Sequence, residues 1–370
     1  MANLRRSENS VMELKDLGFD DWFRKNYQES PIKEHNLARV IAVNKENYII
    51  RNTSKEMLAE ITGKMMYEAE SNLDLPVVGD WIYAEFFNQD TFAIIRKILP
   101  RKSLLKRKVA GQKIEYQPIA SNIDIAFIVQ SSDFDFNLRR LERYLIMANE
   151  NNIIPVILLS KLDLVSPEAL EREIDKTKSL NPDYEIIAFS NETSEGLDDI
   201  RNILQQGKTY CLLGSSGVGK TTLINRLIGY NIFRTDTVRE KDGKGKHITA
   251  RRQLIILEQG GMIIDTPGMR ELGQIGVEKG LSETFRDIID LAQNCHFKDC
   301  THTNETGCAV IQAVEKGKLS AKRYQNYLKI RKESQFYEMS YLEKRRKDKK
   351  FGKLCRSVKE KNKKKYSSGF

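Results

Sequence analysis

The sequence lacks long hydrophobic runs and contains little cysteine. None of its 370 residues belong to a charge-free apolar run of about 18 residues, so we expect no transmembrane helix. The first eighteen residues contain no apolar stretch of signal-peptide length, so we expect no secretory leader. Five cysteines are too few for a disulfide scaffold in a chain of this size. These absences predict a protein of the reducing cytoplasm that has no contact with membranes.

Positive charge is concentrated near one end of the chain. There are 61 lysines and arginines against 51 acidic residues, a formal net charge of +10. Residues 344–365 contain thirteen basic and only two acidic residues, a local net charge of +11. This segment is either a disordered solubilising tail or an arm that binds RNA phosphates. We favour the arm, because the nearly neutral remainder has little long-range attraction for RNA.

The patterning changes along the chain and predicts several domains. A lead-in, residues 1–34, precedes short alternating strands with turn residues over 35–115; these predict a small antiparallel β-barrel of OB type, with another small β-domain as the alternative. Residues 116–280 alternate continuous apolar strands with helical patterns, which predicts an α/β domain with a mostly parallel sheet. Residues 281–340 are mainly helical and contain cysteine and histidine, and a basic tail covers 341–370.

A glycine-rich loop is the strongest functional signal. Residues 214–222 read GSSGVGKTT, after the strand-like TYCLL and at the start of a helical pattern. In this context the loop is typical of phosphate binding, because its glycines let backbone N–H groups surround the phosphates. We expect Lys220 to neutralise the β- and γ-phosphates and Thr221 to bind Mg²⁺. The candidate phosphate ligands are Gly214, Ser215, Ser216, Gly217, Val218, Gly219, Lys220, Thr221 and Thr222.

A second motif indicates which base is bound. Ser160, Lys161, Leu162 and Asp163 directly follow the apolar run IIPVILL. The Asp163 carboxylate can accept hydrogen bonds from both N1–H and N2–H₂ of guanine, a pair that adenine lacks, while the Lys161 stem packs over the base. Ser160 stands where asparagine or threonine is more common, so we expect its contact with the guanine to be weaker or to run through the backbone. Ser190 ends the run EIIAFS and is a candidate third base contact through its backbone, so the sequence predicts GTP.

The segment after the phosphate loop contains candidate ligands for Mg²⁺ and the γ-phosphate. Asp265 begins DTPG after a short apolar run; we expect Asp265 to help hold Mg²⁺ and the Gly268 N–H to contact the γ-phosphate. In the polar segment GKGKHIT, Thr249 is the candidate switch threonine for both groups. The base-reading motif precedes the phosphate loop by about fifty residues, whereas it follows that loop in ordinary GTPases. This order predicts a circularly permuted GTPase.

Three cysteines and one histidine form a candidate metal centre. Cys295, Cys300, His302 and Cys308 are separated by four, one and five residues. Three thiolates and an imidazole suit tetrahedral structural Zn²⁺, and four protein ligands leave no open position for catalysis. The alternative is three unligated thiols and a surface histidine.

Together these features resemble the RsgA (YjeQ) family of small ribosomal subunit biogenesis GTPases. The resemblance also includes VVGDW (77–81), ILPRKS (98–103) and NLRRLERYL (137–145), and it covers about residues 35–330. It implies an OB-fold barrel, a permuted GTPase domain and a helical zinc-binding domain. It further implies that GTP is hydrolysed to GDP and phosphate, with stimulation by the small ribosomal subunit and its rRNA, during late 30S maturation. We expect a monomer.

The resemblance leaves the catalytic step open. Met269 stands after DTPG, where many GTPases have a glutamine that orients water, and a thioether cannot do this. His247 is the family's suggested substitute, and the alternative is an exposed histidine without a catalytic role. Ala250 leaves Thr249 as the single switch threonine. The alternative function is an RNA-binding assembly or checkpoint factor in which nucleotide only switches affinity; an ATPase is a weaker alternative.

A second basic cluster lies at the end of the expected barrel. It could contact RNA phosphates, or it could simply be a solvated charged face. Its members are Arg101, Lys102, Lys106, Arg107 and Lys108.

Overall fold

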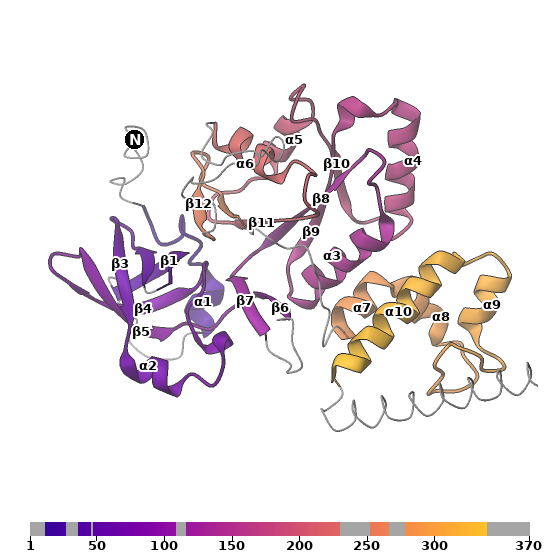
Figure 1. The fold of residues 1–370 in the computed structure, drawn as a ribbon, viewed down its shortest axis with the longest axis horizontal. Coiled ribbons are helices and arrows are strands. Elements are labelled where there is room, and N and C mark those ends of the chain that lie inside the picture. Colours follow the sequence, from indigo (N-terminus) through magenta and orange to yellow (C-terminus); the bar gives the residue numbers. More distant parts are fainter. Residues whose placement is uncertain are drawn as a thin grey trace, which may run out of the picture. The chain divides into compact units, whose positions relative to one another are not determined.

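The computed structural model describes residues 12–26, 36–45, 47–108, 116–229, 252–265 and 278–338. These residues form two compact units, and each unit is described by itself. The first unit contains a β-barrel and an α/β sheet domain, and the second contains the helical region from Leu291 onward (Figure 1). None of the helices in the described ranges combines the length and the apolar composition that a membrane span requires.

Five strands near the N-terminus close into a barrel in the order β1-β2-β3-β5-β4. Along β3, buried Met57 and Ala59 alternate with exposed neighbours, because successive strand residues point to opposite faces. This is the small OB-type barrel that the alternating pattern predicts. Its strands are β1 (Leu37–Val43), β2 (Tyr48–Arg51), β3 (Glu56–Ile61), β4 (Trp81–Phe87) and β5 (Phe92–Ile98), and α2 (Gly63–Glu68) and η2 (Asn72–Asp74) lie between β3 and β4.

The segment before the barrel packs against it through aromatic side chains. Phe19 precedes the short helix α1 (Asp21–Asn26), which contains Phe23. The ring centroids of these two residues lie 5.0 Å and 6.1 Å from that of Trp81 in β4, and all three side chains are buried. Edge-to-face aromatic packing of this kind adds to the free energy gained by burying the rings. Residues 12–26 therefore belong to the folded first unit.

A buried carboxylate joins the two barrel motifs VVGDW and ILPRKS. Asp80 is fully buried and accepts hydrogen bonds from Nε and Nη2 of Arg101 at 2.8 and 2.7 Å. Arg101 also donates to the carbonyls of Leu73 and Leu75, and its side chain is only 15% exposed. A charge that is paired and hydrogen-bonded can be buried at acceptable cost. Arg101 therefore stabilises the barrel and is not available to bind RNA phosphate, and Lys102 pairs with Asp20.

The α/β domain contains a six-stranded sheet in the order β10-β9-β8-β11-β13-β12. Five strands are parallel and only β12 is antiparallel to its neighbour. All five residues of β11 are buried, as expected for a parallel strand that is covered on both faces. The strands are β8 (Ile125–Ser131), β9 (Ile154–Ser160), β10 (Glu185–Ala188), β11 (Thr209–Leu213), β12 (Leu254–Ile256) and β13 (Met262–Ile264).

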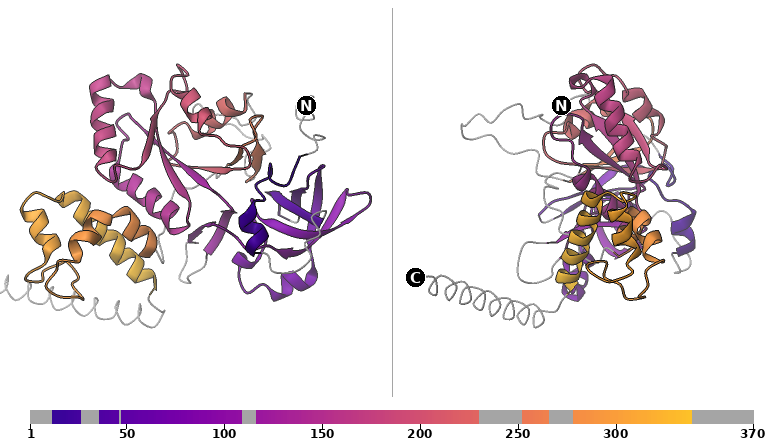
Figure 2. Two further views of the ribbon diagram at one scale, coloured as in Figure 1. Left: turned by 180° about the vertical axis from the view of Figure 1, so that it is seen from behind. Right: turned by 90° about the vertical axis from the view of Figure 1, so that its right-hand side faces the viewer.

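Helices cover both faces of this sheet, giving three layers (Figure 2). On one face, Leu141 of α3 packs in a cluster with Ile128 of β8. On the other face, Leu223 of α6 packs with Phe127, the preceding residue of the same strand. A short sheet of β6 (Leu104–Lys108) and β7 (Tyr116–Ser121) precedes β8. The helices are α3 (Leu138–Glu150), α4 (Pro167–Lys178), α5 (Leu197–Asn202), α6 (Lys220–Ile228) and α7 (Glu278–Thr284), with η3 (Leu162–Leu164) after β9.

Arg39 in β1 links the barrel to the parallel sheet. Its side chain is 1% exposed, and its guanidinium donates to the carbonyl oxygens of Leu17, Gly79 and Asn122. It also donates to Thr209 Oγ1 of β11 at 2.8 Å. Burial lowers the pKa of Arg39 to about 10, although nearby carboxylates oppose this shift. One buried cation therefore holds together the lead-in, the barrel and the strand that carries the phosphate loop.

The second unit consists of helices around the Cys/His loop. α8 (Arg286–Ala292) runs into this unit, and the loop that follows it leads to α9 (Ala309–Glu315). α10 (Ala321–Glu338) is the longest helix among the described residues, with 18 residues. The small core of the second unit includes the buried side chains of Val310, Tyr327 and Ile330.

Candidate functional site

The predicted nucleotide ligands follow strands of one sheet. Because the parallel strands run in one direction, the loops at their carboxyl ends share one edge, which is where ligands bind in open α/β sheets. Ser160 ends β9, Ser190 follows β10, the glycine-rich loop follows β11 and Asp265 follows β13. The fold thus brings together segments that lie up to about a hundred residues apart in the sequence.

The glycine-rich loop joins β11 to α6 in a conformation that depends on its glycines. Gly214, Gly217 and Gly219 all have positive φ, at 153°, 83° and 90°. A Cβ atom on Gly214 would lie 2.4 Å from the Val129 carbonyl oxygen, so only glycine fits at this position. Ser216 and Gly217 are exposed at the tip, while Thr221 and Thr222 are half-buried in the first turn of α6. Backbone N–H groups at a helix start of this kind form an anion site.

Lys220 lies folded over the loop that precedes it. Its ammonium donates to the carbonyl oxygen of Gly214 at 2.8 Å and to that of Ser215. A lysine that is already directed at the loop can contact a phosphate held there through a small change of rotamer. Ser215 Oγ lies 3.4 Å from Asp135 Oδ2, which is a weak contact to the loop after β8.

The turn after β9 is attached to the phosphate loop by Ser160. This residue is fully buried, and its Oγ donates to the Val218 carbonyl oxygen at 2.8 Å. A buried neutral hydrogen bond of this kind contributes about 1 kcal/mol to stability. Ser160 therefore fixes the base-reading turn against the phosphate loop. Leu162 contributes through its backbone, because its N–H donates to the Phe189 carbonyl oxygen at 3.2 Å.

Asp163 lies exposed beside Ser190. The Ser190 hydroxyl donates to one carboxylate oxygen of Asp163. Ser190 Oγ also accepts from the backbone N–H groups of Glu192 and Thr193, both at 3.1 Å, so the hydroxyl has a fixed orientation. This arrangement holds the carboxylate in one position at the sheet edge. A fixed carboxylate of this kind can accept hydrogen bonds from a base that has two adjacent N–H donors.

The sequence motifs did not predict three residues that make contacts at this carboxyl-terminal edge of the sheet. Asn191 donates from its side chain to the Gly219 carbonyl oxygen at 3.1 Å and thereby joins the turn after β10 to the phosphate loop. Asp133 and Asp135, in the loop after β8, contact Lys161 and Arg140 respectively. The signal that could have found them is their place directly after apolar strands of the same sheet.

Asp265 lies at the end of β13, beside the strand that leads into the phosphate loop. Its backbone N–H donates to the Gln253 carbonyl oxygen at 3.2 Å, and its side chain is half-buried. Thr221 and Asp265 offer hydroxyl and carboxylate oxygens, which suit Mg²⁺. The other candidate ligands of this group, His247, Thr249 and Gly268, lie outside the described residues.

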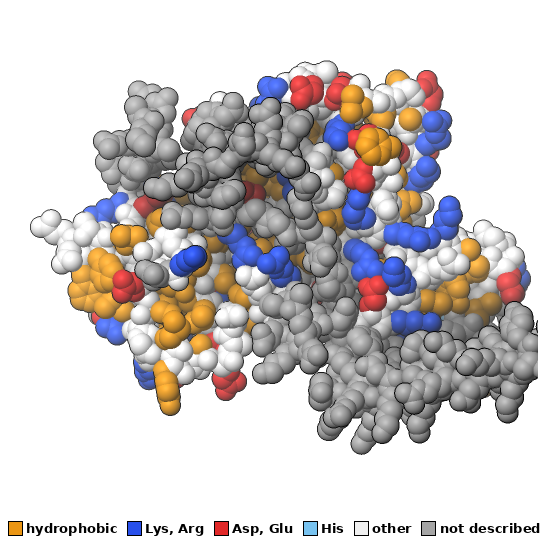
Figure 3. Space-filling model, in the orientation of Figure 1, with side chains coloured by type: hydrophobic (Ala, Val, Ile, Leu, Met, Phe, Trp, Pro, Cys, Tyr) orange, Lys and Arg blue, Asp and Glu red, His pale blue; other side chains and the backbone are white. Residues whose placement is uncertain are grey.

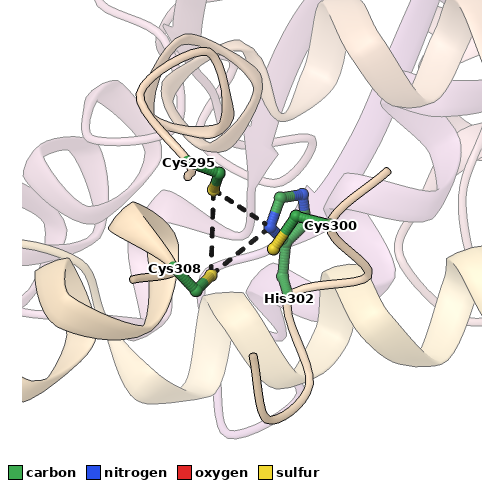
Figure 4. A group of neighbouring side chains, drawn as sticks. All are labelled: Cys295, Cys300, His302 and Cys308. Atoms are coloured by element: carbon green, nitrogen blue, oxygen red, sulfur yellow. Dashed lines mark hydrogen bonds between the residues drawn. The ribbon is translucent and has the colours of Figure 1, made fainter. Parts of the chain in front are cut away.

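The Cys/His cluster in the second unit has the geometry of a metal site. The side chains of Cys295, Cys300, His302 and Cys308 converge, and their ligand atoms all lie within 4.8 Å of one another (Figure 4). Cys295 Sγ is 3.6 Å from His302 Nδ1 and 3.8 Å from Cys308 Sγ. Ligands around tetrahedral zinc are spaced by roughly 3.5–3.8 Å, so the residues fit this ion. Burial raises the pKa of the Cys300 thiol, which a bound cation would reverse.

The loop that carries the cluster is attached to the two neighbouring helices. Tyr324 of α10 donates from its hydroxyl to the His302 carbonyl oxygen, and Arg331 of the same helix donates to that of Thr301 at 3.2 Å. Cys308 caps the start of α9, because its sulfur accepts from the Ile311 N–H at 3.5 Å. The second unit is therefore organised around these four side chains.

The barrel has an exposed hydrophobic surface. Hydrophobic side chains are visible over the barrel strands and α2 in the space-filling view (Figure 3). Leu58, Met66 and Phe87 have 49%, 61% and 40% of their surface exposed, and Tyr67 has 91%. Exposed aromatic and apolar groups on an OB-type barrel suit contact with unstacked nucleic-acid bases.

Comparison with known proteins assigns the chain to one group. The RsgA GTPase family model matches residues 98–275. Small ribosomal subunit biogenesis GTPase RsgA 2 of Lactiplantibacillus plantarum is 44% identical over 305 residues, which cover 82% of this chain and 84% of the relative. The protein of the same name from Vibrio parahaemolyticus is 38% identical over 93% of this chain and 92% of its own. The solved structure of YloQ, a circularly permuted GTPase, superposes with a TM-score of 0.59 at 25% identity and covers 85% of this chain and 100% of that chain.

Proposed function

The chain belongs to the RsgA family of circularly permuted GTPases, and we propose that it hydrolyses GTP while bound to the maturing small ribosomal subunit. The relatives that are 38–44% identical over most of their length carry the name small ribosomal subunit biogenesis GTPase. The observation on which the proposal depends most is the shared sheet edge, where the phosphate loop, Asp163 and Asp265 follow parallel strands.

In this proposal the phosphate loop holds the triphosphate. The backbone N–H groups from Gly214 to Thr222 surround the β-phosphate, and Lys220 moves from the loop carbonyls to the β- and γ-phosphates. Thr221, Thr249 and Asp265 would hold Mg²⁺, and the ion would neutralise charge on the phosphate oxygens. The Gly268 N–H contacts the γ-phosphate. A γ-phosphate held by these groups orders the switch segment, and its release frees that segment.

The guanine is read at the turns after β9 and β10. Asp163 accepts from N1–H and N2–H₂, and the Ser190 hydroxyl keeps its carboxylate in place. The Lys161 stem covers one face of the base. Ser160 acts indirectly, by holding this turn against the phosphate loop. ATP is disfavoured because its N6 amino group and N1 acceptor leave Asp163 without a matching donor pair.

For the chemical step we propose that His247 positions the attacking water. A histidine can accept a proton or a hydrogen bond at neutral pH, which Met269 cannot do. His247 lies in the segment that the γ-phosphate would order. Water would therefore be activated only when nucleotide and subunit together place this side chain.

The remaining parts would bind the ribosome. We infer that the exposed hydrophobic side chains of the barrel and α2 contact unstacked rRNA bases. The basic segment 341–370, outside the described residues, would contact phosphates. One structural Zn²⁺ would hold the second unit together without taking part in catalysis. We propose that the protein acts as a monomer in the cytoplasm, where small subunits mature.

Measured GTP turnover with and without purified small subunits tests the proposal. We expect stimulation by small subunits of at least about tenfold, no stimulation by large subunits, and loss of turnover in a Lys220→Ala variant. A His247→Ala variant should bind nucleotide normally but lose the stimulated rate. If small subunits leave turnover unchanged while nucleotide alters subunit affinity, the chain is an assembly or checkpoint factor and the proposal is wrong.

A further inference from the structure

The loop between β8 and α3 lies between the two nucleotide-binding loops. In the sheet order, β8 has β9 on one side and β11 on the other. The loop after β8 is therefore flanked by the base-reading turn and by the phosphate loop. It contains two carboxylates, Asp133 and Asp135, that neither the motif analysis nor the proposed chemistry uses.

Asp133 holds the ammonium group of Lys161. Its Oδ2 lies 2.7 Å from Lys161 Nζ, and its Oδ1 accepts from Ser131 Oγ and from the Asp135 N–H, both at 2.9 Å. The Asp133 side chain is only 9% exposed, whereas that of Lys161 is 34% exposed. Burial opposes ionisation of Asp133, but the hydrogen bonds from Lys161 and its other donors lower its pKa overall. The carboxylate is thus a fixed anion to which a flexible cation is anchored.

The loop that carries Asp133 is itself rigidly attached. The Ser132 N–H donates to the Ser160 carbonyl oxygen at 2.9 Å, which continues the pairing of β8 with β9. The Asp135 carboxylate accepts two hydrogen bonds from Arg140 in the first turn of α3. Nη1 donates to Oδ1 at 3.1 Å, and Nη2 donates to Oδ2 at 2.8 Å. A bidentate arginine–carboxylate pair fixes orientation as well as distance. Asp133 therefore has little freedom to move away from Lys161.

The contact with Asp133 limits the conformations of the Lys161 side chain before a base binds. Lys161 has a left-handed backbone conformation, with φ 63°, so its side chain leaves the turn in a constrained direction. Lysine has four side-chain torsions and loses much rotamer freedom when it lies along a ligand. Holding Nζ at Asp133 removes most of that freedom before nucleotide binds. The methylene stem then runs between two fixed ends, the backbone of the turn and the Asp133 carboxylate.

We propose that Asp133 is a positioning residue for guanine recognition. It pre-orients the Lys161 stem to cover one face of the base, while Asp163 binds the N1–H and N2–H₂ groups on the edge of the same base. The inference rests on the proposed GTP site and adds to it a residue outside the nucleotide motifs. Asp133 acts through Lys161 and does not itself contact the nucleotide. Preorganisation of this kind improves affinity because less ordering remains for the binding step.

Binding of GDP and ADP to the full chain, followed with fluorescent nucleotide analogues, tests the inference. Asp133→Asn should weaken GDP binding by roughly 5- to 50-fold and leave the weak ADP binding nearly unchanged, so that base selectivity falls. The change should appear in the KM for GTP more than in kcat. The matched control is Asp198→Asn, which breaks an ion pair on α5 in which Asp198 Oδ1 lies 2.7 Å from Arg201 Nη1. This pair is exposed, so the control variant should bind GDP like the unmodified protein.

A double-mutant cycle separates positioning from simple support of the loop. Lys161→Met keeps the apolar stem and removes the ammonium group, so Asp133→Asn should cause no further loss of GDP affinity in that background. An equal loss in both backgrounds, or no loss in either, would overturn the inference. If the unmodified protein shows no preference for GDP over ADP, the proposed function itself fails. Thermal unfolding midpoints identify any variant that has simply lost its fold.

Discussion

The contact between Asp163 and Ser190 is the residue-scale feature on which base selection would depend in the proposed site. The hydroxyl donates to one carboxylate oxygen and is itself oriented by two backbone N–H groups. Asp163 is exposed at the sheet edge, where a nucleotide base can reach it. In the proposed site, its acceptor character would decide which base fits.

Replacing Asp163 by asparagine should change the preferred base. The amide nitrogen of asparagine donates where the carboxylate accepted, which matches the O2 carbonyl of xanthine and opposes the N2 amino group of guanine. We expect kcat/KM for GTP to fall by roughly 100-fold and that for xanthosine triphosphate to rise. Steady-state hydrolysis of both nucleotides measures the ratio. An unchanged preference would show that Asp163 does not contact the base.

Residues that form a motif of local spacing can be recognised in the sequence, whereas residues that act across strands cannot. Gly214, Lys220 and Thr221 form one short strand–loop–helix segment, so their pattern is visible in the sequence. Asp133 and Asn191 gain their contacts only because β8 and β10 lie beside the strands that carry the motifs. The hydroxyl of Ser160 donates to the Val218 carbonyl oxygen, and the contact of Ser160 with the base stays a prediction. No sequence pattern fixes that direction.

At the scale of elements, the Cys/His loop determines how α9 and α10 are arranged. Cys308 caps α9, and two side chains of α10 donate to the backbone of the loop. The spacing of four ligands made this site predictable, because metal coordination requires only that the loop bring them together. The contacts of the loop with α10 depend on packing and could not be predicted.

Removing a ligand should unfold the second unit while leaving the parallel sheet folded. His302→Ala should reduce the bound zinc from about one ion per chain to well below one, because three ligands bind far more weakly. Amide hydrogen exchange should then be fast in α9 and α10 and remain slow in β8 and β11. The control is His296→Ala, in the same loop but outside the cluster. Equal zinc content in both variants would contradict the assignment of the site.

The strand elements were predicted more securely than their pairing. Continuous apolar runs indicate β8 and β9 as strands covered on both faces, TYCLL indicates β11 as a further short strand, and alternation indicates the barrel strands. The parallel pairing of β3 with β5 and the antiparallel position of β12 follow from tertiary packing. The domain boundaries at residues 34, 115, 280 and 340 stay predictions.

At the scale of the whole molecule, Arg39 is the buried link between barrel and sheet. Its guanidinium donates to groups from the lead-in, the barrel and β11, and it is 1% exposed. Three carbonyl oxygens and one hydroxyl would lose their donor if it were removed. The stability of the first unit should therefore depend on this single side chain.

Arg39→Met should lower the free energy of unfolding by about 3–5 kcal/mol, because it leaves buried acceptors without a donor. Urea unfolding followed by tryptophan fluorescence measures this, since Trp81 lies in the neighbouring aromatic cluster. The control is Arg96→Met, which breaks a half-exposed pair with Glu85 and should cost less than about 1 kcal/mol. Equal losses in the two variants would mean that Arg39 does not link the parts.

The proposed function requires that the loops after four parallel strands bind one guanosine triphosphate. A crystal structure of the full chain with Mg²⁺ and a non-hydrolysable GTP analogue tests this most directly. We predict that the guanine lies within hydrogen-bond distance of Asp163, that Lys220 contacts the γ-phosphate, and that Thr221 ligates the metal. A nucleotide bound with its base remote from Asp163, or phosphates away from the 214–222 loop, would contradict the account.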